Sequence, residues 1–242
     1  MKKLTCTLLL SDHARLAEAA ETFARVAFDV CYTVRRSRWD NQLDADMEAA
    51  LEKGADCLLN LLCPVILPKR LLAKVRGPAV NFHPAPPEWP GIGSPSLALY
   101  HDERTFGATV HLMLGKVDSG AILKVSRFPV FPSDTCESLF TRALDHSLFL
   151  FYEVAAEIAA GKTPMPCGET WKRPALTRRQ FERWMTLQPD ATADEVRRKI
   201  RALRHSKFPG PFVEVGGYRF ELPPGSPDPV ESQRQPSGHN QT

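Results

Sequence analysis

Short apolar runs alternate with longer amphipathic segments through the first third of the chain. The short runs are typical of buried strands, and the longer segments repeat apolar residues at helical spacing. Such alternation predicts βαβ units and a parallel sheet. The predicted strands are residues 4–10, 28–34, 56–61 and 79–82, and the predicted helices are residues 14–27, 45–53 and 68–75. The fold class is therefore α/β, with a Rossmann-like, mostly parallel sheet flanked by helices.

The pattern changes after a proline-rich segment at residues 84–90. A helix is predicted at residues 96–101, and two apolar segments at 106–114 and 122–130 follow it. These two segments are short and are joined through residues 115–120, which include two glycines. They are therefore predicted to be antiparallel strands.

A long amphipathic helix is predicted to begin near Asp134 and to end before Gly161. Asp134 and Glu137 have the spacing of a capping box, which favours a helix start at this point. The first domain would then span residues 1–163.

The remainder of the chain is less regular. Residues 164–223 are predicted to form a small extension, with one helix at 192–203 and a β-hairpin at 212–222 that turns at two consecutive glycines. Residues 224–242 are rich in Pro, Ser and Gln and almost free of large apolar residues. Such composition cannot build a core, so a disordered tail is expected there.

Composition narrows the function classes. With 43% hydrophobic and 24% charged residues in 242, the chain is typical of a soluble globular protein. A net charge of +3 is far from the concentrated basic surface of a nucleic-acid binder. No apolar run is long enough to span a membrane or to act as a secretory signal. The 6 cysteines have irregular spacings without a CxxC pair, which is typical of reduced thiols in a cytoplasmic protein without a metal site.

The first strand is not followed by the GxGxxG sequence of a dinucleotide site. Chemistry is instead concentrated after the strand at 79–82. Asn81 and His83 stand two residues apart, so their side chains point to the same side at the carboxyl edge of the sheet, where α/β proteins bind ligands. Asp118 lies in a turn between the two antiparallel strands, from which a carboxylate can point into the same cleft.

Taken singly, these residues have ordinary explanations. An Asn or an Asp before a loop is usually a turn former, and a His beside prolines is usually a hydrogen-bonded loop residue. His111 could also face the cleft, but a strand histidine is more often a core or surface residue. Trp89 could stack on a base or sugar, and the segment Gly91, Gly93 and Ser94 before a helix could offer backbone amides to a phosphate.

Taken together, these residues resemble the characteristic motif of the folate-dependent formyltransferases, which consists of Asn-x-His-Pro, a loop closed by a glycine and a later Asp-x-Gly turn. Here the matching positions are Asn81, His83, Pro84, Gly91, Asp118 and Gly120. Similarity extends over nearly the whole chain before residue 224. The form NFHPAPPEWPGIG is most similar to enzymes that formylate a nucleotide-linked amino sugar, such as those of lipopolysaccharide O-antigen biosynthesis.

The resemblance implies 10-formyltetrahydrofolate as the donor, tetrahydrofolate as the product and no metal. In the reaction, Asn81 and His83 would stabilise the oxyanion, and Asp118 would accept the proton of the amine. Burial of Asp118 between apolar strands is expected to raise its pKa. Substrate-binding residues would be Trp89, Gly91, Gly93 and Ser94. The resemblance implies that the cofactor lies against Cys63, Pro64, Val65, Ile66, Lys116, Val117, Ser119, Gly120 and Ala121.

Three functions stay open. The favoured one is N-formylation of a nucleotide-linked amino sugar by a cytoplasmic enzyme. Formylation of methionyl-tRNA is disfavoured because a single hairpin is less than the β-barrel appendage of tRNA-acting relatives. A folate-binding protein without turnover is disfavoured because a binder has no use for all three polar residues. The sequence is compatible with a homodimer and names neither the sugar nor the nucleotide.

Overall fold

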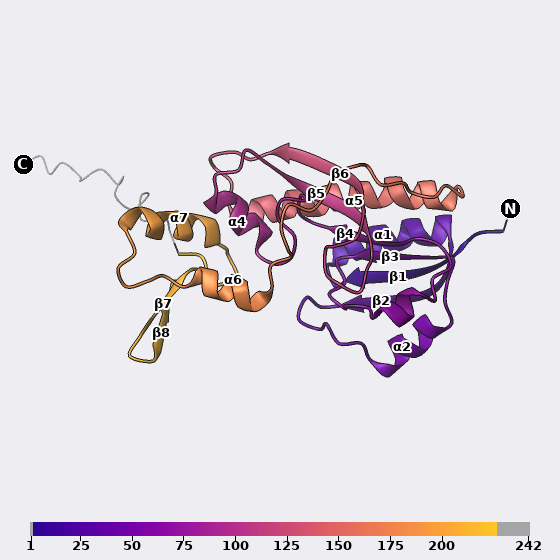
Figure 1. Cartoon of the computed structure of the whole chain (residues 1–242), viewed down its shortest axis with the longest axis horizontal. Helices are drawn as coiled ribbons and strands as arrows, with labels where there is room; N and C mark the ends of the chain where they lie inside the picture. The colour runs from indigo at the N-terminus through magenta and orange to yellow at the C-terminus, as the bar shows by residue number, and fades with distance from the viewer. Residues whose placement is uncertain (1, 227–242) are drawn as a thin grey trace, which may run out of the picture.

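A six-stranded mixed sheet forms the centre of the protein, whose computed structural model describes residues 2–226 (Figure 1). The strand order is β2-β1-β3-β4-β5-β6. The first four strands in sequence are parallel, and β5 and β6 run antiparallel to their neighbours. The strands are β1 (Thr5–Ser11), β2 (Asp29–Arg36), β3 (Cys57–Leu61), β4 (Ala79–His83), β5 (Thr105–Leu112) and β6 (Ile122–Pro129). This arrangement confirms the predicted α/β fold class.

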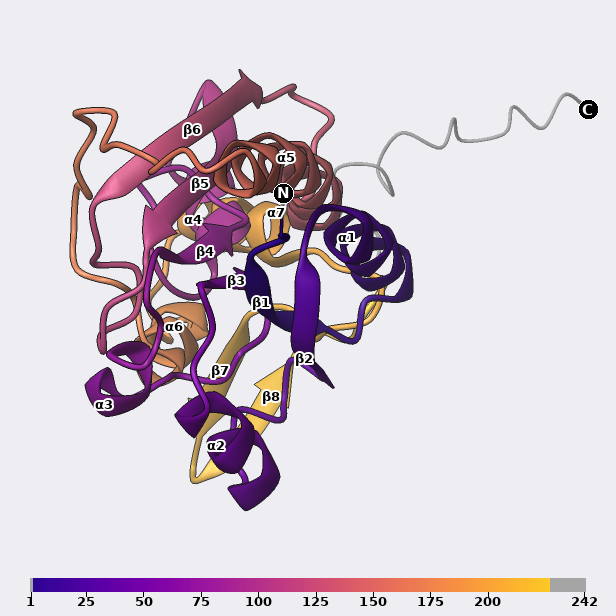
Figure 2. The ribbon, with the colours of Figure 1, turned by 90° about the vertical axis from the view of Figure 1, so that its right-hand side faces the viewer.

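Helices cover both faces of the sheet (Figure 2). Helices α1 (Ala14–Ala27) and α5 (Cys136–Ala159) pack on one face, and α2 (Ala45–Glu52) and α3 (Lys69–Leu72) pack on the other. Because strand side chains alternate between faces, Leu8 and Leu10 contact the first layer while Leu9 contacts the second. Strands buried on both faces must be almost continuously apolar, which is why the parallel strands are recognisable in the sequence as short apolar runs.

The long helix α5 begins close to the predicted position, but with a different capping pair. Its N-cap is Thr135, and the capping box joins Thr135 to Ser138, whereas the predicted pair is Asp134 and Glu137. The Asp134 carboxylate instead accepts hydrogen bonds from the Phe131 amide and the Ser138 hydroxyl. Glu137 accepts hydrogen bonds from Ser206, so its partner is distant in sequence.

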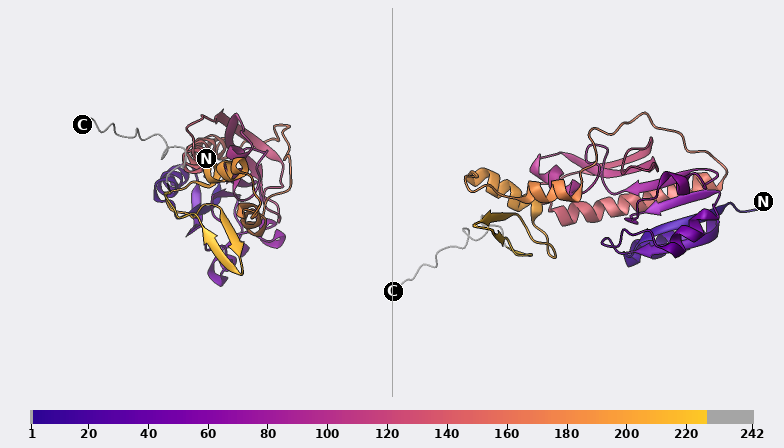
Figure 3. Two further views of the ribbon diagram at one scale, coloured as in Figure 1. Left: turned by 90° about the vertical axis from the view of Figure 1, so that its left-hand side faces the viewer. Right: turned by 60° about the horizontal axis from the view of Figure 1, so that its bottom comes forward.

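The C-terminal extension contains one helix more than predicted. Helix α6 (Arg178–Met185) precedes α7 (Ala193–Leu203) and the hairpin of β7 (Phe212–Val215) and β8 (Tyr218–Glu221). No residue of α6 is fully buried, and its apolar side is formed by two stacked rings, Phe181 and Trp184, of which Trp184 packs against a core cluster. Figure 3 shows these elements beyond one end of α5, on the side of the molecule toward which β1 and β3 run.

Helix α4 (Ser94–Tyr100) connects the extension to the sheet, because α7 packs against it and Ala202 joins its core cluster. Within the predicted tail, the described residues 224–226 form a turn in which the Gly225 amide donates to the carbonyl of His205 at 3.0 Å. Residues 227–242 lie outside the described part of the chain. No helix of residues 2–226 is both long and apolar enough to cross a membrane.

Candidate active site

Four polar side chains meet where β4 ends. Asn81 and His83 lie on β4, His111 lies on β5, and Asp118 lies in the loop between β5 and β6. The antiparallel register pairs Asn81 directly with His111, so their side chains project from the same face. The Asn81 amide nitrogen lies 2.9 Å from His111 Nε2. The structure therefore brings together the three predicted residues and adds a second histidine.

Asp118 is the centre of this group. Its Oδ2 lies 3.3 Å from His83 Nδ1, and its Oδ1 lies 3.2 Å from His111 Nε2. The amide of Gly91 donates a further hydrogen bond to Oδ2 at 2.8 Å. Asp118 is 7% exposed, so these contacts replace the water that would otherwise solvate the carboxylate.

The predicted direction of the Asp118 pKa is wrong. Burial by itself raises the pKa of this carboxyl, as expected from the sequence. The charge of His83, the hydrogen bond and charge of His111, and the Gly91 amide outweigh burial and lower the pKa to about 2. Asp118 is therefore ionised throughout the neutral range. A carboxylate between two imidazole rings is a permanent negative charge that orients both of them.

The backbone holds Asp118 in an unusual conformation. Its φ is 40°, in the left-handed region that residues with a side chain rarely adopt. Gly120 makes the turn possible, because a Cβ at that position would lie 1.8 Å from the carbonyl oxygen of Leu112. The indole of Trp171 donates to the Gly120 carbonyl at 2.8 Å. The turn is thus fixed by contacts with Leu112 of β5 and with Trp171 in the segment after α5.

His83 faces oxygen acceptors on both sides. Its Nδ1 faces the Asp118 carboxylate, and its Nε2 lies 3.2 Å from the carbonyl oxygen of Trp89. A carbonyl and an ionised carboxylate can only accept, so each ring nitrogen of His83 faces an oxygen to which an N–H group can donate. His83 is 8% exposed. This arrangement suits a residue that donates to a developing oxyanion better than one that removes a proton.

The predicted substrate-binding loop is mostly occupied by internal contacts. Trp89 is only 2% exposed, and its ring packs between His101 and Arg173, so it offers no face on which a ligand could stack. The Ser94 hydroxyl donates to the Trp89 carbonyl, and the Gly91 amide is bound to Asp118. Gly93 packs against the ring of Phe181 in α6. The expectation that Trp89 stacks on a ligand is therefore wrong.

The predicted cofactor residues lie on two neighbouring loops. In the first, the Asn60 side chain accepts from the Cys63 amide, which turns the chain after β3. In the second, Gly115 approaches Lys69 of α3, so the loop before Asp118 lies beside the segment that follows β3. Cys63 and Val65 are buried, whereas Ile66 and Val117 are 55% and 41% exposed. Exposed apolar side chains beside a polar cluster are suited to a flat aromatic ligand.

Two residues of the site lie beyond the predicted trio. The sequence offers His111 only as a weaker candidate that could face the cleft, and the strand register places it opposite Asn81, in the site. Trp171 contacts both histidines edge-on, with ring centroids 6.0 Å from His83 and 5.1 Å from His111. It lies in an irregular segment, where nothing in the sequence indicates which part of the fold it contacts. Among residues 2–226, no group of three or more His, Cys, Asp or Glu side chains is placed to hold a metal ion.

Comparison with known proteins gives related enzymes. The methionyl-tRNA formyltransferase of Levilactobacillus brevis is 26% identical over 180 residues, covering 74% of this chain and 56% of that relative. The GDP-perosamine N-formyltransferase of Brucella melitensis is 26% identical over 185 residues, covering 74% of this chain and 70% of the relative. The chain thus spans little more than half the length of the methionyl-tRNA formyltransferase.

Solved structures share the fold. A sugar N-formyltransferase from a Shewanella species superposes with a TM-score of 0.71 at 20% identity, covering 90% of this chain and 96% of that chain. A 4-N formyltransferase from Francisella tularensis gives a TM-score of 0.71 at 16% identity, with the same coverage. The family model described as formyl transferase matches residues 4–154, which is more than half of the chain and includes Asn81, His83, His111 and Asp118. This protein belongs to the formyl transferase family.

Proposed function

We propose that this protein transfers the formyl group of 10-formyltetrahydrofolate to the amino group of a nucleotide-linked amino sugar. The observation that carries the proposal is the cluster in which His83 and His111 flank the buried, ionised carboxylate of Asp118 and Asn81 contacts His111. Such a cluster combines hydrogen-bond donors with a negative charge at the carboxyl end of a central strand. Formyl transfer to an amine requires both.

The reaction begins when a neutral amine attacks the formyl carbon, and negative charge then develops on the formyl oxygen. Asn81 is the most exposed member of the cluster, so its amide is the first donor available to that oxygen. His83 supplies the second donor from Nε2, which lies against the Trp89 carbonyl in the structure. By general experience, losing one oxyanion donor costs about 10²- to 10³-fold in rate.

The proton that the amine releases is accepted by Asp118, directly or through a water molecule. A pKa of about 2 means that Asp118 is already deprotonated when substrate binds; it is a weak base, so it holds the proton only transiently before water takes it. Its carboxylate also orients the His83 ring through Nδ1. The tetrahedral intermediate then collapses as the bond between the formyl carbon and the donor nitrogen breaks, and that nitrogen takes up a proton from water to give tetrahydrofolate.

The formyl donor supplies an activated one-carbon group. Residues suited to hold it are the loop of Cys63, Pro64, Val65 and Ile66 and the loop of Lys116, Val117, Ser119, Gly120 and Ala121. Ile66 and Val117 present apolar surface that fits the ring system of a folate.

Two observations favour a sugar nucleotide over tRNA as acceptor. In sequence, the chain covers 70% of a GDP-perosamine N-formyltransferase but 56% of a methionyl-tRNA formyltransferase, and in structure it covers 96% of a sugar N-formyltransferase and 91% of a methionyl-tRNA formyltransferase. The net charge is only +3, which is small for an enzyme that tracks an RNA backbone. Methionyl-tRNA remains the second candidate, because a methionyl-tRNA formyltransferase and a GDP-perosamine N-formyltransferase are equally similar to this chain, at 26% identity each.

The test is incubation of the protein with 10-formyltetrahydrofolate and a panel of nucleotide-linked 3-amino and 4-amino sugars, read by mass for a formyl gain. Methionyl-tRNA is the competing acceptor, assayed over a range of salt concentrations. A tRNA-acting enzyme should lose affinity steeply as salt rises, whereas a sugar nucleotide should give a shallow slope. Efficient formylation of methionyl-tRNA together with inactivity on every sugar nucleotide would refute the acceptor assignment.

A further inference from the structure

Two arginines from distant parts of the chain meet over one exposed indole. Arg38 and Trp39 lie in the loop after β2, and Arg178 is the first residue of α6. The guanidinium carbon of each arginine lies 4.8 Å from the centre of the Trp39 ring. Arg38 also lies 4.5 Å from the ring of Phe208, which contacts Trp39 edge-on at 6.4 Å. We call Arg38, Trp39, Arg178 and Phe208 the junction cluster.

The junction cluster carries positive charge that no carboxylate balances. Among residues 2–226, neither Arg38 nor Arg178 takes part in an ion pair. Partial burial and the charge of Arg178 lower the pKa of Arg38. His205 and Lys207 lie on the same side, since the charges of Arg38 and Lys207 contribute to lowering the pKa of His205. Two cations held close together repel each other unless an anion lies between them.

The indole in this cluster is unusually open. Trp39 is 61% exposed, although tryptophan usually buries most of its surface. Two guanidinium groups lie over the ring and hold it in place, and the rest of the indole is exposed to contact by a ligand. The cluster therefore combines a site for negative charge with exposed aromatic surface, and a nucleotide offers a partner for each.

The junction cluster lies within reach of the catalytic group. Leu176 pairs with Gly91 through a parallel β-bridge, and the Gly91 amide binds Asp118. Arg178 follows Leu176 by two residues, so its Cα lies within roughly 17 Å of the Asp118 carboxylate, given ordinary backbone and strand spacings. Its side chain can shorten that distance further. A hexose and its diphosphate fill a gap of this order.

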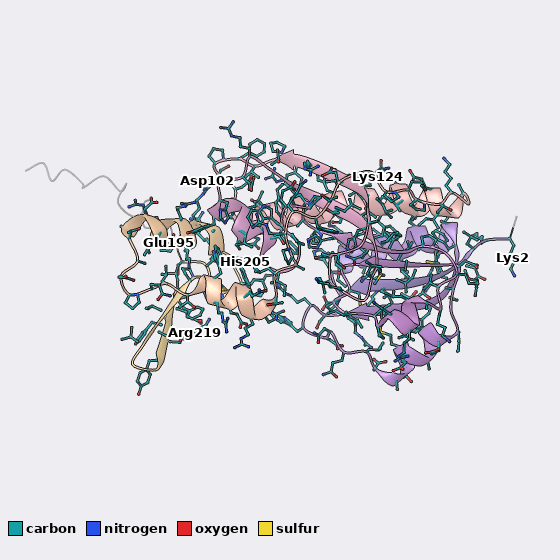
Figure 4. The ribbon with its side chains drawn as sticks, in the orientation of Figure 1. Lys2, Asp102, Lys124, Glu195, His205 and Arg219 are labelled. Carbon is teal, nitrogen blue, oxygen red and sulfur yellow. The ribbon has the colours of Figure 1, made fainter. Side chains whose placement is uncertain are left out.

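The position of the junction cluster in the fold agrees with a short distance between it and Asp118. Figure 1 shows the loop after β2 reaching toward α6 at the carboxyl end of the parallel strands, where Asn81 and His83 also lie. Figure 4 shows His205 and Glu195 in the C-terminal extension, at the end of the molecule away from Lys2. The extension therefore contributes Arg178 and Phe208 to the edge of the sheet that carries the candidate active site.

We propose that Arg38 and Arg178 form the subsite for the diphosphate of the nucleotide-linked acceptor and that Trp39 contacts its base. The assignment rests on the proposed function and replaces the loop at Gly91, Gly93 and Ser94 as the phosphate site. The guanidinium groups donate paired hydrogen bonds to phosphate oxygens, which ammonium groups cannot match. Neither arginine touches the reacting atoms, so both are binding residues.

The experiment measures binding of UDP, GDP, dTDP and inorganic diphosphate to the full chain by calorimetry, without folate. Arg38→Ala and Arg178→Ala are each expected to weaken binding about tenfold, since a hydrogen bond to a charged group is worth at least that factor. The double variant should lose measurable binding. Arg179→Ala is the matched control, because it removes the same charge from the next, exposed position of α6 and should leave binding unchanged.

Melting temperatures separate a binding role from a structural one. A binding role predicts that the double variant melts at the wild-type temperature without ligand and loses the increase that the nucleotide diphosphate gives to the wild type. A lower melting temperature without ligand, accompanied by unchanged binding, would make the arginines structural and overturn the subsite. Unchanged binding in the double variant, or equal losses in Arg179→Ala, would overturn it as well.

The outcome is independent of the proposed reaction. His83→Ala should bind the nucleotide diphosphates as the wild type does, because His83 is not part of the junction cluster. If the diphosphates bind through Arg38 and Arg178 while no sugar nucleotide is formylated, the proposed function fails and the subsite stands. If sugar nucleotides are formylated equally well by the double variant, the subsite fails and the proposed function stands.

Discussion

Replacement of Asp118 by Asn tests the centre of the candidate active site with little change of shape. The substitution removes the negative charge and turns one acceptor oxygen into a donor amide. His83 Nδ1, His111 Nε2 and the Gly91 amide would then face a group with fewer acceptors than they require. Because Asp118 is buried, water cannot readily take over these contacts.

The magnitude follows from the pKa of Asp118. Its fall from 3.8 to about 2 in the folded protein corresponds to about 2 kcal/mol, since one pKa unit is about 1.4 kcal/mol. A depressed pKa stabilises the fold above the unfolded-state value and ceases to do so as pH falls through the folded-state value. The wild type should therefore lose about 2 kcal/mol between pH 4 and pH 2 that Asp118→Asn does not lose.

The assay is urea unfolding of both proteins between pH 2 and pH 7, together with steady-state formyl transfer at neutral pH. Asp118→Asn should lower kcat by about 10²-fold or more and leave folate affinity nearly intact, because the carboxylate acts in the reaction, whereas the proposed folate contacts come from neighbouring residues of the same loop. Asp190→Asn is the control, since Asp190 is exposed and has no ion pair among the described residues. Near wild-type turnover, or a stability difference that does not shrink toward pH 2, would refute the reasoning.

Three further outcomes are expected. Gly120→Ala should lower the free energy of unfolding by about 3 kcal/mol and abolish activity, because the added Cβ would overlap the Leu112 carbonyl. Gly115→Ala is the control, since its Cβ would meet the flexible side chain of Lys69. Lys199→Met should lower the free energy of unfolding by about 1 to 3 kcal/mol, measured in urea, and leave kcat unchanged, because the buried amine donates to two carbonyls at the end of α6. Equal stability of the variant and the wild type would contradict this role. Removal of residues 227–242, which contain one large apolar residue, should change neither melting temperature nor turnover, and a clear fall in either would show that they bind the folded part.

Local sequence was sufficient for the α/β class and for the first two residues of the candidate site. Strands such as β1 and β3 are buried on both faces, so their side chains must be apolar regardless of what covers them. Asn81 and His83 share a face because strand side chains alternate with a period of two residues. Both properties depend only on neighbouring positions, which is why the amino-acid sequence alone predicts them.

Tertiary structure decided which groups meet at the candidate site and in which direction the pKa of Asp118 shifts. His111 joins the cluster through the register of β4 and β5, and Trp171 reaches it from beyond α5. The pKa of Asp118 falls because two rings and one amide converge on it, although burial alone acts in the opposite direction. Arg38 and Arg178 meet over one indole although they lie far apart in the sequence. Each of these depends on groups brought together by folding, and no local pattern records the distance between residues remote in sequence.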